Sequence, residues 1–261
     1  LAHAFINVRG LKGTTWSSRL KRAMLLPASL VESLVLVRKF RPDVAVGVGG
    51  YASGPPLAAA RLLGVPCVLL EQNSVPGATN RLLARFSRAV FTTFAGGEAY
   101  FPRSRVLRLG NPIRRQLLEN FLRAAREPSD RFRLLVLGGS QGARGINDLM
   151  IGAAPTLVRR LPNLTIIHQT GQSDVSRVAD AYREANVDAE VATFIDAVSS
   201  AYRAADLVVC RAGATTLAEV TVAKRASILI PFPHAADNHQ ERNARDIVDA
   251  GAALMLRQSE T

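Results

Sequence analysis

The sequence predicts an α/β protein built from two Rossmann-like domains, each a parallel sheet flanked by helices, with the first domain incomplete. Three observations predict this class. Short apolar runs rich in β-branched residues alternate with helical patterns, which is typical of repeated βα units. Glycine-rich turns follow several of the apolar runs, and the alternation stops once, near Gly110. A length of 261 residues suits two domains, so we expect them at 1–113 and 132–261 with a linker at 114–131.

The expected elements follow the chain in this order. In the first half, strands are expected at residues 44–48, 67–70 and 89–93, and helices at 55–63, 78–86 and around Glu98. Residues 114–133 are charged and have helical spacing, with a hinge expected at 128–130. In the second half, strands are expected at 132–137, 165–168, 191–193, 207–210, 228–230 and 252–256, with helices between them. Six strands in this arrangement make a nearly complete doubly wound domain.

The composition excludes several classes of protein. With 48% hydrophobic and 21% charged residues, the chain resembles a folding protein and not a disordered or collagenous one. No apolar run approaches the roughly 18 residues that cross a bilayer, and residues 1–10 lack a signal-peptide pattern. Cys67 and Cys210 lie inside strand-like runs, so we expect buried reduced thiols and a reducing cytoplasm.

The positive charge is confined to the first half. Residues 1–130 carry 19 basic and 7 acidic side chains, a net of +12, whereas residues 131–261 carry 14 of each. This asymmetry predicts an anionic partner: a nucleic acid, an anionic membrane or a phosphorylated substrate. With 6% aromatic residues and no nucleic-acid-binding motif, no nucleic-acid partner is expected. Residues 16–40 fit a basic amphipathic surface helix interrupted at Pro27, and equally a helix packed on its own sheet.

A glycine-rich loop follows the first strand of the second half. The strand runs directly into G-G-S-Q-G-A-R at residues 138–144 and then into a helix. Its candidate phosphate-binding residues are Gly138, Gly139, Ser140, Gln141 and Gly142. Glycines let backbone amides approach an anion, and the helix N-terminus adds partial positive charge. The spacing matches neither a P-loop nor a dinucleotide fingerprint, so an NTPase and a dehydrogenase are both disfavoured.

Two further segments follow strands of the second half. R-A-G-A-T-T-L-A-E at 211–219 offers backbone amides to a diphosphate and the Glu219 carboxylate to two ribose hydroxyls; a helix-dipole or salt-bridge role for Glu219 is the alternative. In P-F-P-H-A-A-D-N-H-Q-E-R-N-A at 231–244, His234 and His239 have no third ligand beside them, so hydrogen bonding is favoured over a metal site. His168 ends an apolar strand and is expected to be structural.

In the first half, G-V-G-G-Y-A-S-G-P-P at 47–56 and E-Q-N-S-V-P-G-A-T-N at 71–80 each follow a strand and offer small and polar residues to a cleft. Together with G-N-P-I-R, F-I-D and the three loops above, these segments resemble, in order and spacing, the MurG family of peptidoglycan UDP-N-acetylglucosamine transferases. The resemblance covers essentially the whole chain. It implies a GT-B fold and inverting transfer of N-acetylglucosamine from UDP-GlcNAc to undecaprenyl-pyrophosphoryl-MurNAc-pentapeptide, the step from lipid I to lipid II.

The same resemblance implies partners and a site. The implied partners are the two substrates, an anionic membrane surface and other wall-synthesis proteins. The implied location is the inner face of the cytoplasmic membrane, with peripheral attachment. The implied donor-site residues are Asn73, Arg114, Ser140, Ile195, Ala214, Thr215, Thr216, Leu217, Ala218, Glu219 and Gln240. The backbone of Ile195 is expected at uracil, Glu219 at ribose and Gln240 at the sugar. Arg114 and Ser140 are expected to neutralise the departing UDP.

The chain departs from the family pattern at its ends. Members begin with a strand and a G-G-T-G-G-H-type loop that carries a candidate base, and we expect this loop to precede Leu1 and a closing helix to follow Thr261. We therefore expect donor binding with slow or no turnover. Glu71 is the candidate substitute base; the alternative is a structural role, as part of a buried salt bridge or as a loop brace. No tightly bound cofactor is expected; in the absence of a D-x-D motif, dependence on a divalent cation stays open.

Three alternatives are kept. The first is a truncated nucleotide-sugar-binding protein without turnover, and the second is another GT-B transferase. A nicotinamide oxidoreductase is the least favoured, because the glycine spacing is wrong.

Overall fold

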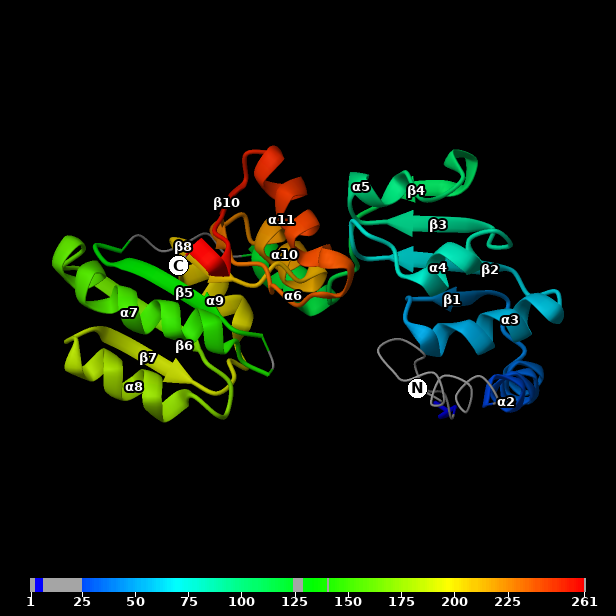
Figure 1. The fold of residues 1–261 in the computed structure, drawn as a ribbon, viewed down its shortest axis with the longest axis horizontal. Helices are drawn as coiled ribbons and strands as arrows, with labels where there is room; N and C mark the ends of the chain where they lie inside the picture. The colour runs from blue at the N-terminus through cyan, green and yellow to red at the C-terminus, as the bar shows by residue number, and fades with distance from the viewer. Residues whose placement is uncertain (1–2, 7–24, 124–128, 140, 261) are drawn as a thin grey trace. The chain divides into compact units, whose positions relative to one another are not determined.

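The computed structural model describes residues 3–6, 25–123, 129–139 and 141–260. The chain forms two compact units, Leu1–Gly110 and Asn111–Thr261, each with its own parallel sheet (Figure 1). The segment expected to be a linker, 114–131, contains helix α6 (Arg115–Arg123). This helix packs on α9 (Val198–Ala204) and so belongs to the second unit.

The first unit is a four-stranded sheet in the order β1-β2-β3-β4, with every pair parallel. Its elements are α2 (Leu25–Phe40), β1 (Ala45–Gly47), η1 (Tyr51–Ser53), α3 (Gly54–Leu62), β2 (Cys67–Glu71), α4 (Ala78–Leu83), β3 (Ala89–Thr92), α5 (Ala95–Glu98), η2 (Arg103–Arg105) and β4 (Val106–Arg108). The first three strands confirm the sequence prediction. Strand β4 was not predicted, because three residues with arginine at the end give no readable periodicity.

Helix α2 does not follow the amphipathic pattern expected for residues 16–40. Pro27 lies in the first turn, where a missing N–H is tolerated, so the helix is not interrupted there. Its buried positions within the described residues include Ser29 and Ser33, whose small side chains allow close packing on α3. Val31 and Val35 are 60% and 59% exposed. Residues 16–24 of the expected helix lie outside the described residues.

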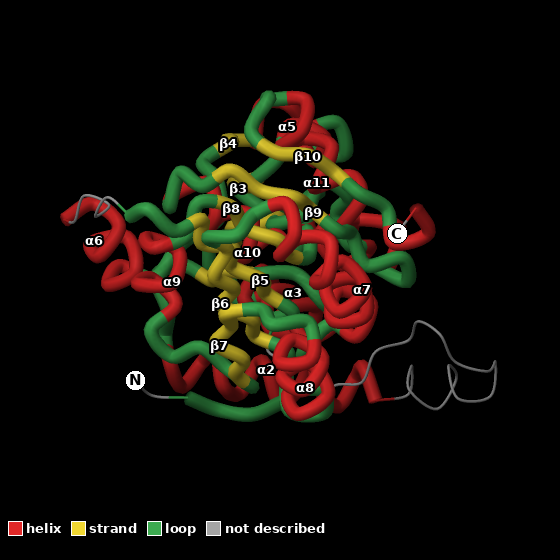
Figure 2. Tube along the Cα trace, turned by 90° about the vertical axis from the view of Figure 1, so that its left-hand side faces the viewer, coloured by secondary structure: helices red, strands yellow, loops and turns green. Residues whose placement is uncertain are grey.

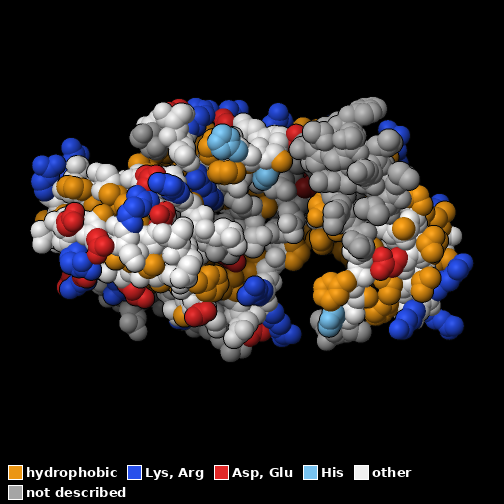
Figure 3. Space-filling view, turned by 60° about the horizontal axis from the view of Figure 1, so that its bottom comes forward, with side chains coloured by type: hydrophobic (Ala, Val, Ile, Leu, Met, Phe, Trp, Pro, Cys, Tyr) orange, Lys and Arg blue, Asp and Glu red, His pale blue; other side chains and the backbone are white. Residues whose placement is uncertain are grey.

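The two faces of the first sheet differ in burial. On one face Leu69 and Val90 are fully buried, within the core cluster that includes Leu57 of α3. On edge strand β1 and its flanks, Val44, Val46 and Val48 are about half exposed (47–61%). Figure 3 shows hydrophobic side chains gathered among basic ones on this unit. Parallel sheets are normally covered on both faces, so this exposed apolar surface distinguishes the first unit.

The second unit is a six-stranded parallel sheet in the order β10-β9-β8-β5-β6-β7. Its remaining elements are β5 (Phe132–Leu137), α7 (Arg144–Arg160), β6 (Leu164–Gln169), α8 (Val175–Glu184), β7 (Asp188–Ala192), β8 (Leu207–Cys210), α10 (Ala214–Val222), β9 (Ala226–Leu229), η3 (Ala236–Asn238), α11 (His239–Asp249), β10 (Ala253–Met255) and η4 (Gln258–Glu260). Renumbered from its first strand, the order is 3-2-1-4-5-6, the dinucleotide-binding topology. All six predicted strands are present, although β7 begins three residues earlier than predicted.

Helices cover the second sheet on both faces. Figure 2 shows α7 and α8 on one side of strands β5 to β7 and α9 on the other. The core beneath α7 and α8 includes Val136, Ile146, Ile166 and Val178, all completely buried. Burial of each such side chain contributes about 1.5–3 kcal/mol to the free energy of folding, relative to leaving it exposed. Both cysteines of the chain are buried and free, as predicted.

Candidate functional site

The two glycine-rich loops of the second unit begin at neighbouring strand ends. Strands β5 and β8 pair in parallel, with Leu137 opposite Cys210, and one glycine-rich loop starts directly after each of these residues. The chain runs outward in opposite directions from this pair of strands, which makes it the switch point of the sheet. Open α/β sheets bind ligands at the carboxyl ends of strands at such a point.

The loop after β5 lies close to neighbouring backbone at Gly138 and Gly142. Gly139 and Gly142 have φ angles of 77° and 76°, in the left-handed region that favours glycine. A Cβ on Gly142 would lie 2.2 Å from the carbonyl oxygen of Thr170. Helix α7 begins at Arg144, immediately after the loop, so backbone amides and a helix N-terminus meet here. Ser140, expected to bind phosphate, lies outside the described residues, and Gln141 is exposed.

The loop after β8 leads into α10. The first residues of this helix both pack in the core and present free backbone amides. Ala214 and Leu217 are buried in the core, and the Leu217 amide donates to the Gly213 carbonyl at 2.9 Å. The helical pattern leaves the amides of residues 214–216 without an intrahelical acceptor. The amides of residues 214–216 are therefore the free donors at this helix end, and the Leu217 amide is not one of them. Thr215 is exposed, while Thr216 and Ala218 are half-buried.

Glu219 lies in the next part of α10 and is half-buried. Its carboxylate accepts a hydrogen bond from the Tyr202 hydroxyl at 3.3 Å. Burial raises the pKa of Glu219, while the Tyr202 bond and the charge of Arg114 act in the opposite direction. Tyr202 is completely buried and meets the Phe121 ring edge-on at 5.8 Å. Arg114 and Glu219, both predicted, lie in the same unit, and the Arg114 charge acts on the Glu219 carboxylate.

Ile195 follows the edge strand β7. Its amide N–H donates to the side-chain oxygen of Gln169 at 3.1 Å. Because that amide is engaged, the Ile195 carbonyl is the atom available to a base edge. No motif in the sequence singles out Gln169, which is 5% exposed at the end of β6.

The loop after β9 places Gln240 at the start of α11. The side-chain oxygen of Gln240 accepts the Phe232 amide at 3.0 Å, which leaves its NH₂ group as a donor. Asp237 and Asn238 are both left-handed, with φ angles of 53° and 52°. Two consecutive residues in this region store strain, a property that is concentrated at functional sites.

Arg211 ties the loops after β8 and β9 together. Its guanidinium donates to the carbonyls of Ile230 and Pro231, both at 3.2 Å, and to the side chain of Gln258 at 2.9 Å. It also lies 5.5 Å from the centre of the Phe232 ring. Sequence reasoning missed this role, because all of these partners are at least 19 residues away along the chain.

His168 has the structural role that the sequence predicts. His168 is completely buried; Nδ1 is 2.8 Å from the Tyr182 hydroxyl and Nε2 is 3.1 Å from Asn147 Oδ1. Asn147 Nδ2 donates to Thr170, so its Oδ1 accepts from Nε2–H and Tyr182 donates to Nδ1. Burial lowers the pKa of His168 to about 4. His239 bonds a backbone carbonyl, and no cluster of three metal-ligating side chains occurs among the described residues.

In the first unit, Glu71 forms a closed set of hydrogen bonds. It is 4% exposed; Oε1 accepts the Asn73 amide at 3.0 Å and Oε2 accepts Asn80 Nδ2 at 2.8 Å. Asn80 also donates to the Leu70 carbonyl at 3.2 Å. Both carboxylate oxygens therefore hold the loop that follows β2. This geometry is that of a loop brace, one of the structural roles considered for Glu71.

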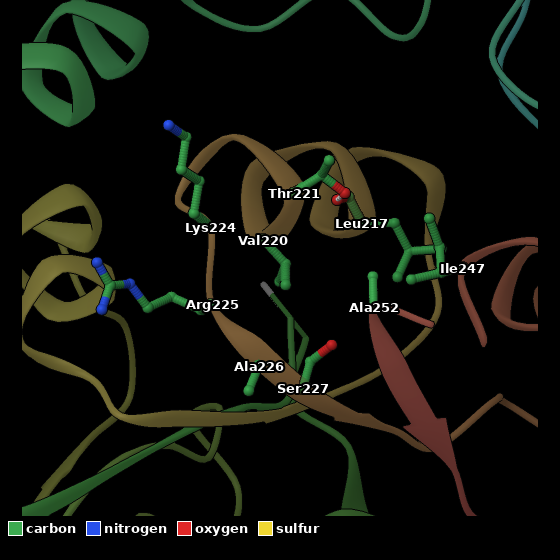
Figure 4. A pocket seen from close by; sticks show the side chains of 9 residues that line it. All are labelled: Leu217, Val220, Thr221, Lys224, Arg225, Ala226, Ser227, Ile247 and Ala252. Carbon is green, nitrogen blue, oxygen red and sulfur yellow. Dashed lines mark hydrogen bonds between the residues drawn. The ribbon is translucent and has the colours of Figure 1, made fainter. Parts of the chain in front are cut away.

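A separate shallow pocket lies at the other end of α10 (Figure 4). Leu217 and Val220 line it from the helix, together with Ile247 of α11. The buried Ser227 hydroxyl, near the start of β9, has no hydrogen-bond partner among the described residues. Because the pocket is at the amino end of that strand, it is distinct from the loops described above.

Comparisons with known proteins identify relatives of both units. The model of the glycosyltransferase family 28 C-terminal domain matches residues 133–261, and that of the family's N-terminal domain matches residues 1–92. Two relatives, from Myxococcus xanthus and Pelobacter propionicus, carry the name UDP-N-acetylglucosamine--N-acetylmuramyl-(pentapeptide) pyrophosphoryl-undecaprenol N-acetylglucosamine transferase. They are 53% and 46% identical to this chain, each over 98% of it, and the chain covers 66% and 73% of their lengths. It covers 65% of the relative from Anaeromyxobacter dehalogenans (strain 2CP-1).

Solved structures give the same grouping. The Acinetobacter baumannii MurG structure is 33% identical, with a TM-score of 0.74 over 97% of this chain and 70% of that one. A UDP-GlcNAc 2-epimerase from Neisseria meningitidis, solved with UDP-GlcNAc, has a TM-score of 0.60 over 95% of this chain and 72% of that one. At 12% identity, it shows the fold alone.

Proposed function

The chain belongs to glycosyltransferase family 28, and from this premise we propose that it takes part in transferring N-acetylglucosamine from UDP-GlcNAc to the lipid-linked MurNAc-pentapeptide of peptidoglycan synthesis. The observation that carries the proposal is the pair of glycine-rich loops at the switch point, with Glu219 on the helix that one of them begins. The names of the relatives supply the donor and acceptor.

Donor recognition is proposed at the carboxyl edge of the second sheet. The free amides of residues 214–216 face the diphosphate, where a helix N-terminus favours negative charge. Glu219 accepts the ribose hydroxyls, the Ile195 carbonyl meets the uracil edge, and the NH₂ group of Gln240 donates to the sugar. Asn73, another of the implied donor-site residues, lies in the first unit.

The proposed reaction is a single displacement with inversion. An acceptor hydroxyl oxygen bonds to the anomeric carbon while the bond from that carbon to the diphosphate oxygen breaks. The hydroxyl proton passes to a base, and negative charge develops on UDP. Amides at the start of α10 and the Arg114 guanidinium are placed to stabilise this charge as it develops. Glu71 is not proposed as the base, because both of its oxygens already accept hydrogen bonds.

The test of the donor site uses Glu219. In calorimetric titrations of the full chain, Glu219→Ala should weaken UDP binding by about 1–3 kcal/mol through loss of charge-assisted hydrogen bonds. The exposed Glu184→Ala is the matched control and should bind as the unmodified chain does. Unchanged affinity in Glu219→Ala would instead assign Glu219 a structural role with Tyr202.

Turnover is tested separately. UDP release is followed after UDP-GlcNAc and a lipid-linked acceptor analogue are added to the full chain. Release that depends on the acceptor supports transfer, whereas UDP binding without release favours the alternative of a nucleotide-sugar-binding protein. Repeating the assay with and without a divalent cation addresses metal dependence.

We also propose peripheral attachment of the first unit to the anionic inner face of the cytoplasmic membrane. The support is the net charge of +11 in residues 1–110, which carry 15 basic and 4 acidic side chains, and the exposure of Val31, Val35 and Phe40 beside Arg38 and Lys39. Within the described ranges, no helix has the length and apolarity that a membrane span requires.

Sedimentation with vesicles tests this attachment. The chain should bind vesicles that contain acidic phospholipid and be released by salt, because exposed charges are screened over about 8 Å at physiological ionic strength. Equal binding to neutral vesicles at every salt concentration would favour apolar attachment through the valines instead.

A further inference from the structure

Gln169 occupies the middle of three neighbouring strand ends. It is the last residue of β6, and the sheet places β6 between β5 and β7. In the parallel registers, Leu137 of β5 and Ala192 of β7 both lie opposite Gln169. The segments that leave these two neighbours are the glycine-rich loop and the segment that contains Ile195. A buried side chain at this position is therefore within reach of both.

Both ends of the Gln169 amide are used, each on a different segment. Nε2 donates to the Gly139 carbonyl at 2.9 Å, and Oε1 accepts the Ile195 amide at 3.1 Å. The side chain is 5% exposed, so neither bond competes strongly with water. One amide thus joins the segment after β5 to the segment after β7.

The Gly139 carbonyl is also the centre of the glycine turn. It accepts the Gly142 amide at 3.0 Å in addition to the Gln169 amide. The backbone oxygen of Gln169 accepts the Gly138 amide at 3.0 Å, which fixes the start of the same loop. The Gly139 carbonyl is therefore turned inward, toward β6. Because Gln169 also engages the Gly138 amide, the start of the loop is fixed relative to β6.

We propose that Gln169 is a positioning residue that couples the phosphate-facing loop to the base-facing segment, so that the two ends of a nucleoside diphosphate are recognised cooperatively. The inference rests on the donor site proposed above and adds to it a coupling between two subsites. Gln169 contacts neither end of the ligand; it holds the two protein segments that do. Removal of the two Gln169 side-chain hydrogen bonds should reduce the affinity for UDP more than the affinity for either half of UDP alone.

Three variants separate the bridge from its surroundings. Gln169→Met keeps the volume and removes both polar ends. Gln169→Glu keeps an acceptor for Ile195 and sets a carboxylate against the Gly139 carbonyl, so it breaks only the connection to the phosphate-facing loop. Gln172→Glu makes the same charge change at an exposed position three residues away and serves as the control.

The affinities of the full chain and of each variant are measured for uridine, inorganic pyrophosphate and UDP. With Gln169→Met, UDP affinity should fall about tenfold, a usual size for coupling between sites, while uridine and pyrophosphate affinities change less than about threefold. Gln169→Glu should weaken pyrophosphate and UDP and leave uridine binding close to normal. Gln172→Glu should match the unmodified chain.

Amide hydrogen exchange in the absence of ligand provides a second measurement. Exchange at Gly142 and Ile195 should quicken in Gln169→Met, whereas amides of β8 should not change. If Gln169→Met does not fold, as judged by its melting transition, Gln169→Glu carries the test.

Two results overturn the coupling. One is wild-type UDP affinity in both Gln169 variants, and the other is an equal loss for all three ligands, which marks general loosening of the fold. Failure of the unmodified chain to bind UDP would overturn the proposed donor site itself, and the coupling with it.

Discussion

The loops at the strand ends of the two units are held in different ways. In the first unit, one carboxylate, Glu71, binds Asn73 and Asn80 of its own loop, and all three residues lie within ten positions of one another. In the second unit, the bracing side chains reach other strands: Gln169 spans segments from β5 to β7, and Arg211 joins the loops after β8 and β9. The first arrangement fixes one loop, and the second fixes several loops relative to one another.

The difference matters for what each edge can do. The Glu71 brace ties its loop to the strand that the loop leaves, β2, and involves no side chain from a neighbouring strand-end loop. Loops joined across strands keep their mutual spacing, which recognition of a ligand with two distinct ends requires. The second unit also extends this bracing below the loops, through the His168 network that joins α7, β6 and α8.

The largest effect is expected from breaking the single-loop brace. Glu71→Leu leaves the half-buried Asn73 amide and the buried Asn80 side chain without their charged acceptor, which should destabilise the first unit by about 4 kcal/mol. Denaturant-dependent hydrogen exchange reports each unit separately, and amides of the second sheet should be unaffected. Glu98→Leu removes an exposed ion pair with Arg108 and should cost far less. Equal effects of the two variants would contradict the brace.

The pH dependence of stability tests the buried His168 network of the second unit. His168 has a folded-state pKa of about 4 against an ordinary 6.5, so between these values the unfolded chain binds a proton that the folded chain does not. The resulting stabilisation is complete above pH 6.5 and is lost as the pH falls toward 4, a total of about 3 kcal/mol. His168→Gln should remove this pH dependence, and the exposed His234→Gln should retain it. Unfolding curves at several pH values provide the measurement.

The smallest expected effects come from a pair of glycines. Gly142→Ala places a Cβ 2.2 Å from the Thr170 oxygen at a positive φ, which should cost about 2 kcal/mol and weaken UDP binding. Gly152→Ala lies on α7 with nothing within 4 Å and should stabilise the fold by about 0.5–1 kcal/mol. Melting curves would show shifts of opposite sign. A stabilised Gly142→Ala would mean that the loop is not fixed by its neighbours.

The sequence predicted the parts of the fold that depend on local pattern. Of the ten strands in the described part of the chain, nine were expected close to their observed positions, because buried parallel strands are typically short apolar runs between turns. The loop-brace alternative for Glu71 was also accessible, since its partners follow within the same motif. The domain limits of 1–113, 114–131 and 132–261 stay predictions, although α6 contacts the second unit from within the middle segment.

The rest could not be predicted because it depends on which strands become neighbours. Gln169 and Ile195 are 26 residues apart, and Arg211 and Gln258 are 47 apart. Neither pair shares a periodicity or a motif that points to its partner. Tyr202 likewise gains its role only when α9 and α10 bring it to Glu219. These side chains act through tertiary contacts, and patterns in a single sequence do not show which distant residues will meet.

Helix α10 also fixes the distance between its first free amides and the Glu219 carboxylate. Its unpaired amides begin at Ala214, and Glu219 follows five residues later on the same rigid element. At a rise of 1.5 Å per residue, the two lie about 7.5 Å apart along the helix axis. Inserting a single residue between them would lengthen this interval and turn the carboxylate through about 100°. Because this distance is fixed by the helix, the site selects ligands by the distance between their charged and hydroxylated ends, in addition to their charge.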